Sequence, residues 1–143
     1  PHYSGGGGLF LTVKDYGRVL QMLLRGGSLD GKTLLKAETV DTMFQNNIGN
    51  IQPLALATAM PNLSNTADMS FGNKVTFGLG LLLHTDGIDG GRKANSGSWA
   101  GLFNSYYWVD REAGTYGIFG TQVLPFYDGV AIETLLEFEQ AVY

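Results

Sequence analysis

The sequence predicts an α/β protein of the α+β kind, in which helices flank an antiparallel sheet. Apolar residues recur at helical spacing near the N-terminus, from Val13 to Arg25, and again near the C-terminus, from Val130 to Val142. Between them, from Phe77 to Thr121, short apolar and aromatic runs alternate with turn-forming Gly, Asp and Asn. Such runs are typical of successive antiparallel hairpins, and the two helices can cover the sheet.

The first helix has clear start and stop signals. Thr12 is followed three residues later by Asp15, which is the spacing of a capping box, and Gly26-Gly27 is suited to end a helix. The glycines Gly5 to Gly8 in front of it predict a hinge or lead-in. A phosphate loop is disfavoured because no strand precedes these glycines and no Gly-Lys-Ser/Thr follows them.

A tight hairpin and a second short helix follow. Asp30-Gly31 lies between two short runs and has the composition of a two-residue hairpin turn. The next helix is predicted at about 36–44. From about 46 to 74 the chain is rich in Asn, Pro, Ser, Thr, Ala and Met without a clear period, which predicts a long irregular surface excursion.

The sheet is predicted from alternating patterns. In the aromatic run, Tyr106 and Trp108 alternate with Tyr107 and Val109, so both faces of the sheet are expected to be covered. The strands are predicted at Phe77 to Leu83, Arg92 to Ser96, Leu102 to Val109 and Thr115 to Thr121.

Composition limits the class of protein. The 143 residues are 44% hydrophobic and only 15% charged, against about 25% charged in an average protein, which indicates one compact unit. We therefore treat residues 1–143 as a single partial domain. The net charge of −4 and the absence of a basic cluster argue against a nucleic-acid partner. No Cys is present, which is compatible with a cytoplasmic as well as a periplasmic or secreted location.

The apolar stretches and the first residues of the chain bear on two further points, membrane insertion and the extent of the protein. The longest apolar stretches, 77–83 and 116–126, are shorter than the roughly 18 residues of a membrane helix, so no membrane span is expected. The chain opens Pro1-His2-Tyr3 without an initiator Met or a signal-like segment. We expect it to be part of a longer protein.

Several polar residues are best explained by ordinary structural roles. His84 has no second His at ligand spacing, so a structural histidine is favoured over a metal ligand or a general base. Asp86 and Asp89 lie in a Gly-rich turn that lacks the ligand pattern of a calcium loop. Ser98 lacks the flanking glycines of a nucleophile elbow. The sequence predicts no metal site and no cofactor.

The most informative segment runs from Trp99 to Asp110 and reads WAGLFNSYYWVD. It resembles the sheet-edge motif of serine β-lactamase-like hydrolases, a family with class C β-lactamases, family VIII carboxylesterases and penicillin-binding proteins. The form is similar to the Trp-Gly-Gly variant of the esterase branch. The Gly-rich lead-in, the first helix and the hairpin are also similar to what precedes this motif in the family. The resemblance covers essentially the whole chain and implies the C-terminal part of a β-lactamase/transpeptidase-like fold.

The resemblance also implies site residues. Trp99, Ala100 and Gly101 occupy the places of the Lys-Thr-Gly triplet of penicillin-binding enzymes, where substrate binds along the strand. By position, the backbone N–H of Leu102 would stabilise the oxyanion of an acyl-transfer reaction. The resemblance implies a small-molecule ester or amide as substrate. Because Trp99 replaces the triplet's cationic Lys, a neutral ester of a short or medium acyl group is expected to be preferred.

The family's nucleophile is expected outside this chain. None of its serines is followed three residues later by Lys, so the Ser-x-x-Lys motif would be supplied by a companion N-terminal part. With that part, the resemblance implies a serine hydrolase that acts through an acyl-enzyme, mainly an esterase, and leaves weak β-lactamase activity open. The alternatives are a β-lactamase or D-Ala peptidase proper, or a non-catalytic binding or scaffolding module that keeps the hydrolase fold.

Overall fold

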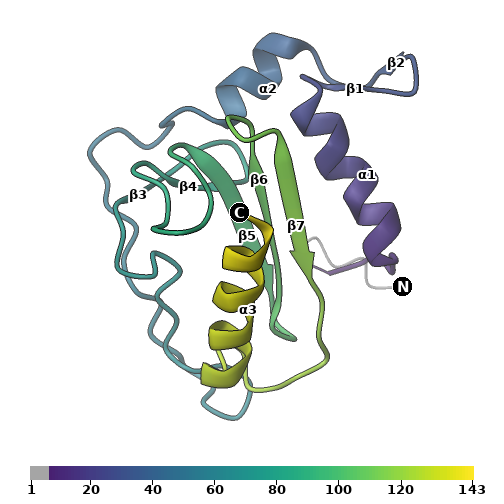
Figure 1. The fold of residues 1–143 in the computed structure, drawn as a ribbon. Helices are drawn as coiled ribbons and strands as arrows, with labels where there is room; N and C mark the ends of the chain where they lie inside the picture. Colours follow the sequence, from purple (N-terminus) through teal and green to yellow (C-terminus); the bar gives the residue numbers. More distant parts are fainter. Residues whose placement is uncertain (1–6) are drawn as a thin grey trace.

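The computed structural model describes residues 7–143, so Gly5 and Gly6 of the predicted lead-in lie outside the described part. Five antiparallel strands form one sheet in which each strand pairs with the next along the chain (Figure 1). The predicted antiparallel sheet with flanking helices is confirmed. The strands are β3 (Val75–Phe77), β4 (Leu82–His84), β5 (Ser96–Gly101), β6 (Ser105–Asp110) and β7 (Thr115–Phe119).

Three helices accompany the sheet. Helix α1 (Val13–Leu24) begins at Thr12 with the predicted capping box, and α2 (Ala37–Met43) follows the small hairpin of β1 (Ser28–Leu29) and β2 (Lys32–Thr33). Helix α3 (Gly129–Val142) lies across one face of the sheet, while α1 runs along the side of β7 (Figure 1). The long excursion lies beyond β3 at the opposite side of the sheet.

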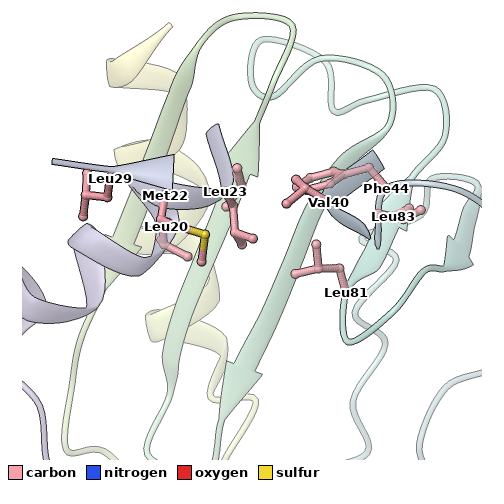
Figure 2. Packing of buried hydrophobic residues seen from close by; sticks show 9 residues of the cluster. Leu20, Met22, Leu23, Leu29, Val40, Phe44, Leu81 and Leu83 are labelled. Atoms are coloured by element: carbon pink, nitrogen blue, oxygen red, sulfur yellow. The ribbon is translucent and has the colours of Figure 1, made fainter. Parts of the chain in front are cut away.

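The alternation in β6 divides the core into two clusters, as the sequence predicts. Tyr106 and Trp108 pack with Leu135 of α3 on one face. Val109 joins the cluster on the other face, where α1 and α2 supply half of the remaining side chains. Figure 2 shows this second cluster, which consists of Leu20, Met22, Leu23, Leu29, Val40, Phe44, Leu81, Leu83 and Val109.

The single strand predicted from Phe77 to Leu83 is wrong. The segment is a hairpin in which Phe77 of β3 pairs with Leu82 of β4. Gly80 has a φ of +76°, a left-handed conformation that reverses the chain. Gly78 contacts α2 so closely that a Cβ there would lie 1.9 Å from the carbonyl oxygen of Met43. The Gly-Leu alternation therefore reflects a tight turn against a helix.

Two other strand boundaries are also corrected. The segment 92–95 contains no strand residues, and β5 extends from Ser96 through the triplet to Gly101. The strand predicted from Leu102 starts only at Ser105. Leu102 therefore lies in the turn between β5 and β6, which is closed by Asn104 at a φ of +56°. A three-residue hairpin loop that ends in a left-handed residue is a common way to join two strands.

The excursion from 46 to 74 contains no helix or strand. One isolated bridge, Leu56 with Ala67, lies inside the excursion, and a second, Ser64 with Phe126, connects it to the loop before α3. Within the described residues, no helix is long and apolar enough to cross a membrane.

Candidate functional site

The end of β5 has one edge that no strand of residues 7–143 covers. On one side, β5 pairs with β6 from Gly97 to Gly101. On the other side, β4 pairs with β5 only from Ser96 to Ser98. From Trp99 onward, the backbone of β5 therefore presents an edge that can pair with an extended ligand. Trp99, Ala100 and Gly101, the three predicted binding positions, all lie on this stretch.

Leu102 follows directly, at the first position of the β5–β6 turn. Its side chain is about half exposed, at 47%. No acceptor among residues 7–143 receives the Leu102 backbone N–H. Because successive residues of a strand direct their N–H groups to opposite edges, Leu102 shares its edge with Ala100. The predicted oxyanion donor is thus a backbone N–H without a partner inside the described chain.

Trp99 lies between two hollows of different size. Its side chain is 37% exposed, and its ring meets that of Phe77 edge to face at 5.3 Å. One hollow is an open groove of about 1280 Å³ between the segment preceding α1 and strands β5 to β7. The other is a pocket of about 180 Å³ between β3, β4 and the excursion, with apolar walls that include Leu54, Leu56 and Met69.

Charged side chains are scarce among the described residues around this edge. Among the described residues that line the groove, none has a charged side chain. Tyr107 lines it, and burial together with the neighbouring Tyr16 raises the pKa of the Tyr107 phenol, so that this group stays protonated. Asp68 is the single charged residue in the described lining of the smaller pocket. A neutral apolar ligand therefore meets no buried charge here.

Sequence reasoning missed the role of Asn104. Its side chain is fully buried; three of its hydrogen bonds connect the β5–β6 turn with the segment 123–128 before α3, and the fourth comes from the Tyr106 hydroxyl of β6. Asn is one of the few residues that adopt a left-handed φ readily. An Asn at the end of a three-residue loop is the only sequence signal that could have indicated it.

His84 has a structural position in the described chain. It is fully buried on β4 and its ring stacks on Phe71 at 6.0 Å. Burial, and to a lesser degree the cation of Arg92, lowers the pKa of His84 to about 3, so the ring is neutral. Neither ring nitrogen has a hydrogen-bond partner in the described residues.

The remaining polar candidates also take ordinary positions. Ser98 is 3% exposed, which removes its hydroxyl from any substrate that approaches the surface. Asp86 forms an exposed ion pair with Lys74 at 3.5 Å. No group of three metal-ligating side chains occurs among residues 7–143.

Comparisons with known proteins agree with this fold. No family model matches the chain. The chain is 34% identical over 128 residues to a lovastatin esterase from Penicillium rubens, covering 85% of this chain and 30% of the esterase. It is 33% identical over 129 residues to the acyltransferase calJ from Penicillium decumbens, covering 86% of this chain and 29% of the acyltransferase.

Solved structures give the same result. The simvastatin synthase LovD from Aspergillus terreus is 28% identical, with a TM-score of 0.76 over 97% of this chain and 36% of the synthase. A candidate β-lactamase from Bacteroides dorei is 27% identical, with a TM-score of 0.60 over 92% of this chain and 41% of that protein.

The chain thus spans about a third of the length of its relatives, 30% and 29% for the two curated proteins. These relatives are esterases and acyltransferases of the β-lactamase-like type. In sequence and in fold, the chain corresponds to the C-terminal portion of a serine β-lactamase-like hydrolase.

Proposed function

We propose that this chain is the substrate-binding C-terminal part of a serine hydrolase that acts on neutral carboxylic esters through an acyl-enzyme. The observation that carries this proposal is the open edge of β5: it begins at Trp99 and leads to the Leu102 N–H, which has no partner among residues 7–143. An extended ester can lie along such an edge, and the N–H can stabilise the negative charge that develops on its carbonyl oxygen.

The reaction divides into two balanced steps. The serine oxygen of a Ser-x-x-Lys motif outside this chain attacks the ester carbonyl carbon, a C–O bond forms, and the alcohol leaves with the serine's proton. Water then attacks the acyl-enzyme, releases the carboxylic acid and returns the proton to the serine. In both steps Leu102 would donate its N–H to the carbonyl oxygen while that oxygen carries negative charge.

The exposed apolar residues before α1 suggest where the rest of the enzyme packs. Leu9, Phe10 and Leu11 are 85%, 102% and 55% exposed. Leu9 and Leu11 also line the large groove beside Trp99. Large contiguous apolar surfaces normally mark an interface, so we infer that the companion N-terminal part covers this segment and closes the groove.

Neutral surroundings favour an uncharged acyl or alcohol group. Trp99 supplies an apolar wall where penicillin-binding relatives place a Lys, and the adjoining 180 Å³ pocket is lined mainly by apolar side chains. A short or medium apolar chain fits this pocket without leaving a polar group unpaired.

Acyl transfer is the second candidate. Two relatives are named as an acyltransferase and a synthase. An alcohol in the groove of about 1280 Å³ could attack the acyl-enzyme in place of water, with the same nucleophile and the same oxyanion donor. The two activities therefore differ only in the acceptor.

The test is made on the full-length gene product. Incubation with a fluorophosphonate, followed by peptide mapping, should place one covalent label on the serine of a Ser-x-x-Lys motif, and p-nitrophenyl butyrate should be turned over. A variant with alanine at that serine is the control and should lose both. If the wild-type protein gives neither label nor turnover, the scaffolding alternative replaces the enzyme. Added alcohol that diverts acyl product from acid to ester would identify acyl transfer.

A further inference from the structure

We propose that Asn104 is a positioning residue for the oxyanion donor: it fixes the β5–β6 turn so that the Leu102 N–H remains directed at the open edge of β5. This inference rests on the proposed function. It concerns a buried side chain that touches neither the groove nor the smaller pocket.

The four hydrogen bonds of the Asn104 amide group all cross from the turn to neighbouring backbone or side chains. Its Nδ2 donates to the carbonyl oxygens of Val123 at 3.0 Å and Pro125 at 2.8 Å. Its Oδ1 accepts from the Tyr106 hydroxyl at 2.8 Å and from the Asp128 backbone N–H at 3.0 Å. Both donors and both acceptor positions of the amide are therefore used.

A second set of hydrogen bonds connects the same turn to the segment that follows β7. The Thr121 hydroxyl donates to the carbonyl oxygen of Phe103 at 2.5 Å and also lies 3.2 Å from that of Asn104. The backbone N–H of Val123 donates to the Phe103 carbonyl oxygen at 3.3 Å. The last two turn residues are thus tied to the loop that follows β7, while the N–H of Leu102 has no partner in the described part of the chain.

An oxyanion site requires a fixed backbone that holds a free N–H donor. The β5–β6 turn, with the Leu102 N–H, meets this requirement in the described part of the chain. A preorganised N–H stabilises developing charge because it does not have to reorient during the reaction. Leu102 lies in an exposed turn, where backbone motion would otherwise be expected. The buried Asn104 supplies the rigidity from two residues away.

Asn has two properties that no single substitute retains. Gly can adopt the φ of +56°, but it removes all four hydrogen bonds. Asp keeps the shape and the acceptor oxygen, but it turns a second oxygen toward the carbonyls of Val123 and Pro125. A carboxylate in that position is unfavourable, so the Asp would bind a proton and donate to only one of the two carbonyls.

The experiment uses the full-length protein with the variants Asn104→Gly and Asn104→Asp. Asn95→Gly is the matched control, because Asn95 also has a left-handed φ, of +59°, but lies in the exposed turn before β5. For each variant, kcat and KM for p-nitrophenyl butyrate are measured, and active sites are counted by complete fluorophosphonate labelling so that unfolded protein does not contribute.

We expect Asn104→Gly to lower kcat per active site by about tenfold or more with KM changed by less than about twofold, and Asn95→Gly to change neither. The kcat of Asn104→Asp relative to wild type should rise as the pH falls from about 8 to about 6, because protonation restores one donor. The pH dependence of Asn104→Asp tests the proposal even if Asn104→Gly does not fold.

Two outcomes would overturn the role of Asn104. One is a lower melting temperature in Asn104→Gly with wild-type kcat per active site and no pH rescue in Asn104→Asp, which would make the residue purely structural. The other is an equal loss of kcat in Asn95→Gly. In both cases the wild type remains active, whereas a wild type without label or turnover would refute the proposed function itself.

Discussion

Arg92 and Glu139 form an ion pair that is closed to solvent, with 2% and 1% of the two side chains exposed. Arg92 Nε donates to Oε1 of Glu139 at 2.8 Å, and the backbone N–H of Arg92 donates to the same oxygen at 2.9 Å. The pair joins the segment before β5 to helix α3. It therefore connects the strand that carries the candidate site with the helix that covers the sheet.

Neutralising the carboxylate of this buried pair should lower the free energy of unfolding much more than neutralising the carboxylate of an exposed pair. In Glu139→Gln, the buried guanidinium of Arg92 loses its counter-charge, and the free energy of unfolding should fall by about 3–5 kcal/mol. Asp30→Asn is the matched control, since Asp30 pairs with Arg18 at the surface and Asn tolerates its left-handed φ. That change should cost less than about 1 kcal/mol. Urea unfolding measures both, and equal costs would show that the buried pair contributes nothing special.

His84 should make the protein sensitive to acid. Burial lowers its pKa to about 3, against 6.5 for the unfolded side chain, so the unfolded state binds the proton more tightly. The contribution of the neutral ring to stability is full above about pH 6.5 and is lost progressively as the pH falls toward 3. Between pH 7 and pH 4, this linkage amounts to about 3 kcal/mol.

The measurement is the urea midpoint as a function of pH in wild type and His84→Gln, which cannot bind the proton. The variant should lose less stability between pH 7 and pH 4 than the wild type. A proton NMR titration of His84 that showed a midpoint near 6.5 in the folded protein would contradict the assignment.

Leu102 should act through its backbone. Because its side chain is 47% exposed, Leu102→Ala in the full-length enzyme should keep most of the esterase activity. Leu102→Pro deletes the N–H, and by analogy with other lost oxyanion donors it should lower kcat/KM by about a hundredfold or more. The two variants are compared at equal numbers of folded molecules, judged by circular dichroism. Equal losses would mean that the N–H has no special role.

Local signals explain what the sequence could predict of the fold. The capping box at Thr12 and Asp15 and the Asp30-Gly31 turn depend on residues a few positions apart, so both are visible in the sequence and both are present. The strand predicted over 77–83 was wrong because alternating Gly and Leu residues are compatible with one continuous strand and also with two short strands joined by a tight turn. The left-handed φ of Gly80 and the contact of Gly78 with α2 distinguish the two, and that contact is tertiary.

The sequence indicated which residues to consider for the candidate site, but not how they are arranged in space. The resemblance of the segment after Trp99 to a family motif indicated which residues to consider. The open edge at Ala100 depends on where β4 begins, and the fixed β5–β6 turn depends on Asn104 reaching the loop before α3. The buried pair of Arg92 and Glu139 likewise joins distant segments, and no periodicity in a single sequence reports such a contact.

Trp99 should set the preference for uncharged substrates. In the penicillin-binding enzymes that the motif resembles, a Lys at this position would attract a substrate carboxylate, whereas Trp99 offers an apolar face and one N–H donor. Among the described residues that line the groove and the small pocket, none is a Lys or Arg that could replace the missing cation. Loss of one charge-assisted hydrogen bond is worth about 1.5–3 kcal/mol, or roughly ten- to a hundredfold in preference.

The full-length enzyme should therefore have a higher kcat/KM for p-nitrophenyl butyrate than for a carboxylate-bearing cephalosporin. Trp99→Lys should shift this ratio toward the cephalosporin by about tenfold or more, because it restores a cation at the edge of β5. Trp99→Phe is the control: it keeps an apolar ring against Phe77, and it should leave the ratio close to that of the wild type. A wild type that prefers the cephalosporin would contradict the role of Trp99, and so would a Lys variant with an unchanged ratio, since in either case the charge at this position would not govern substrate choice.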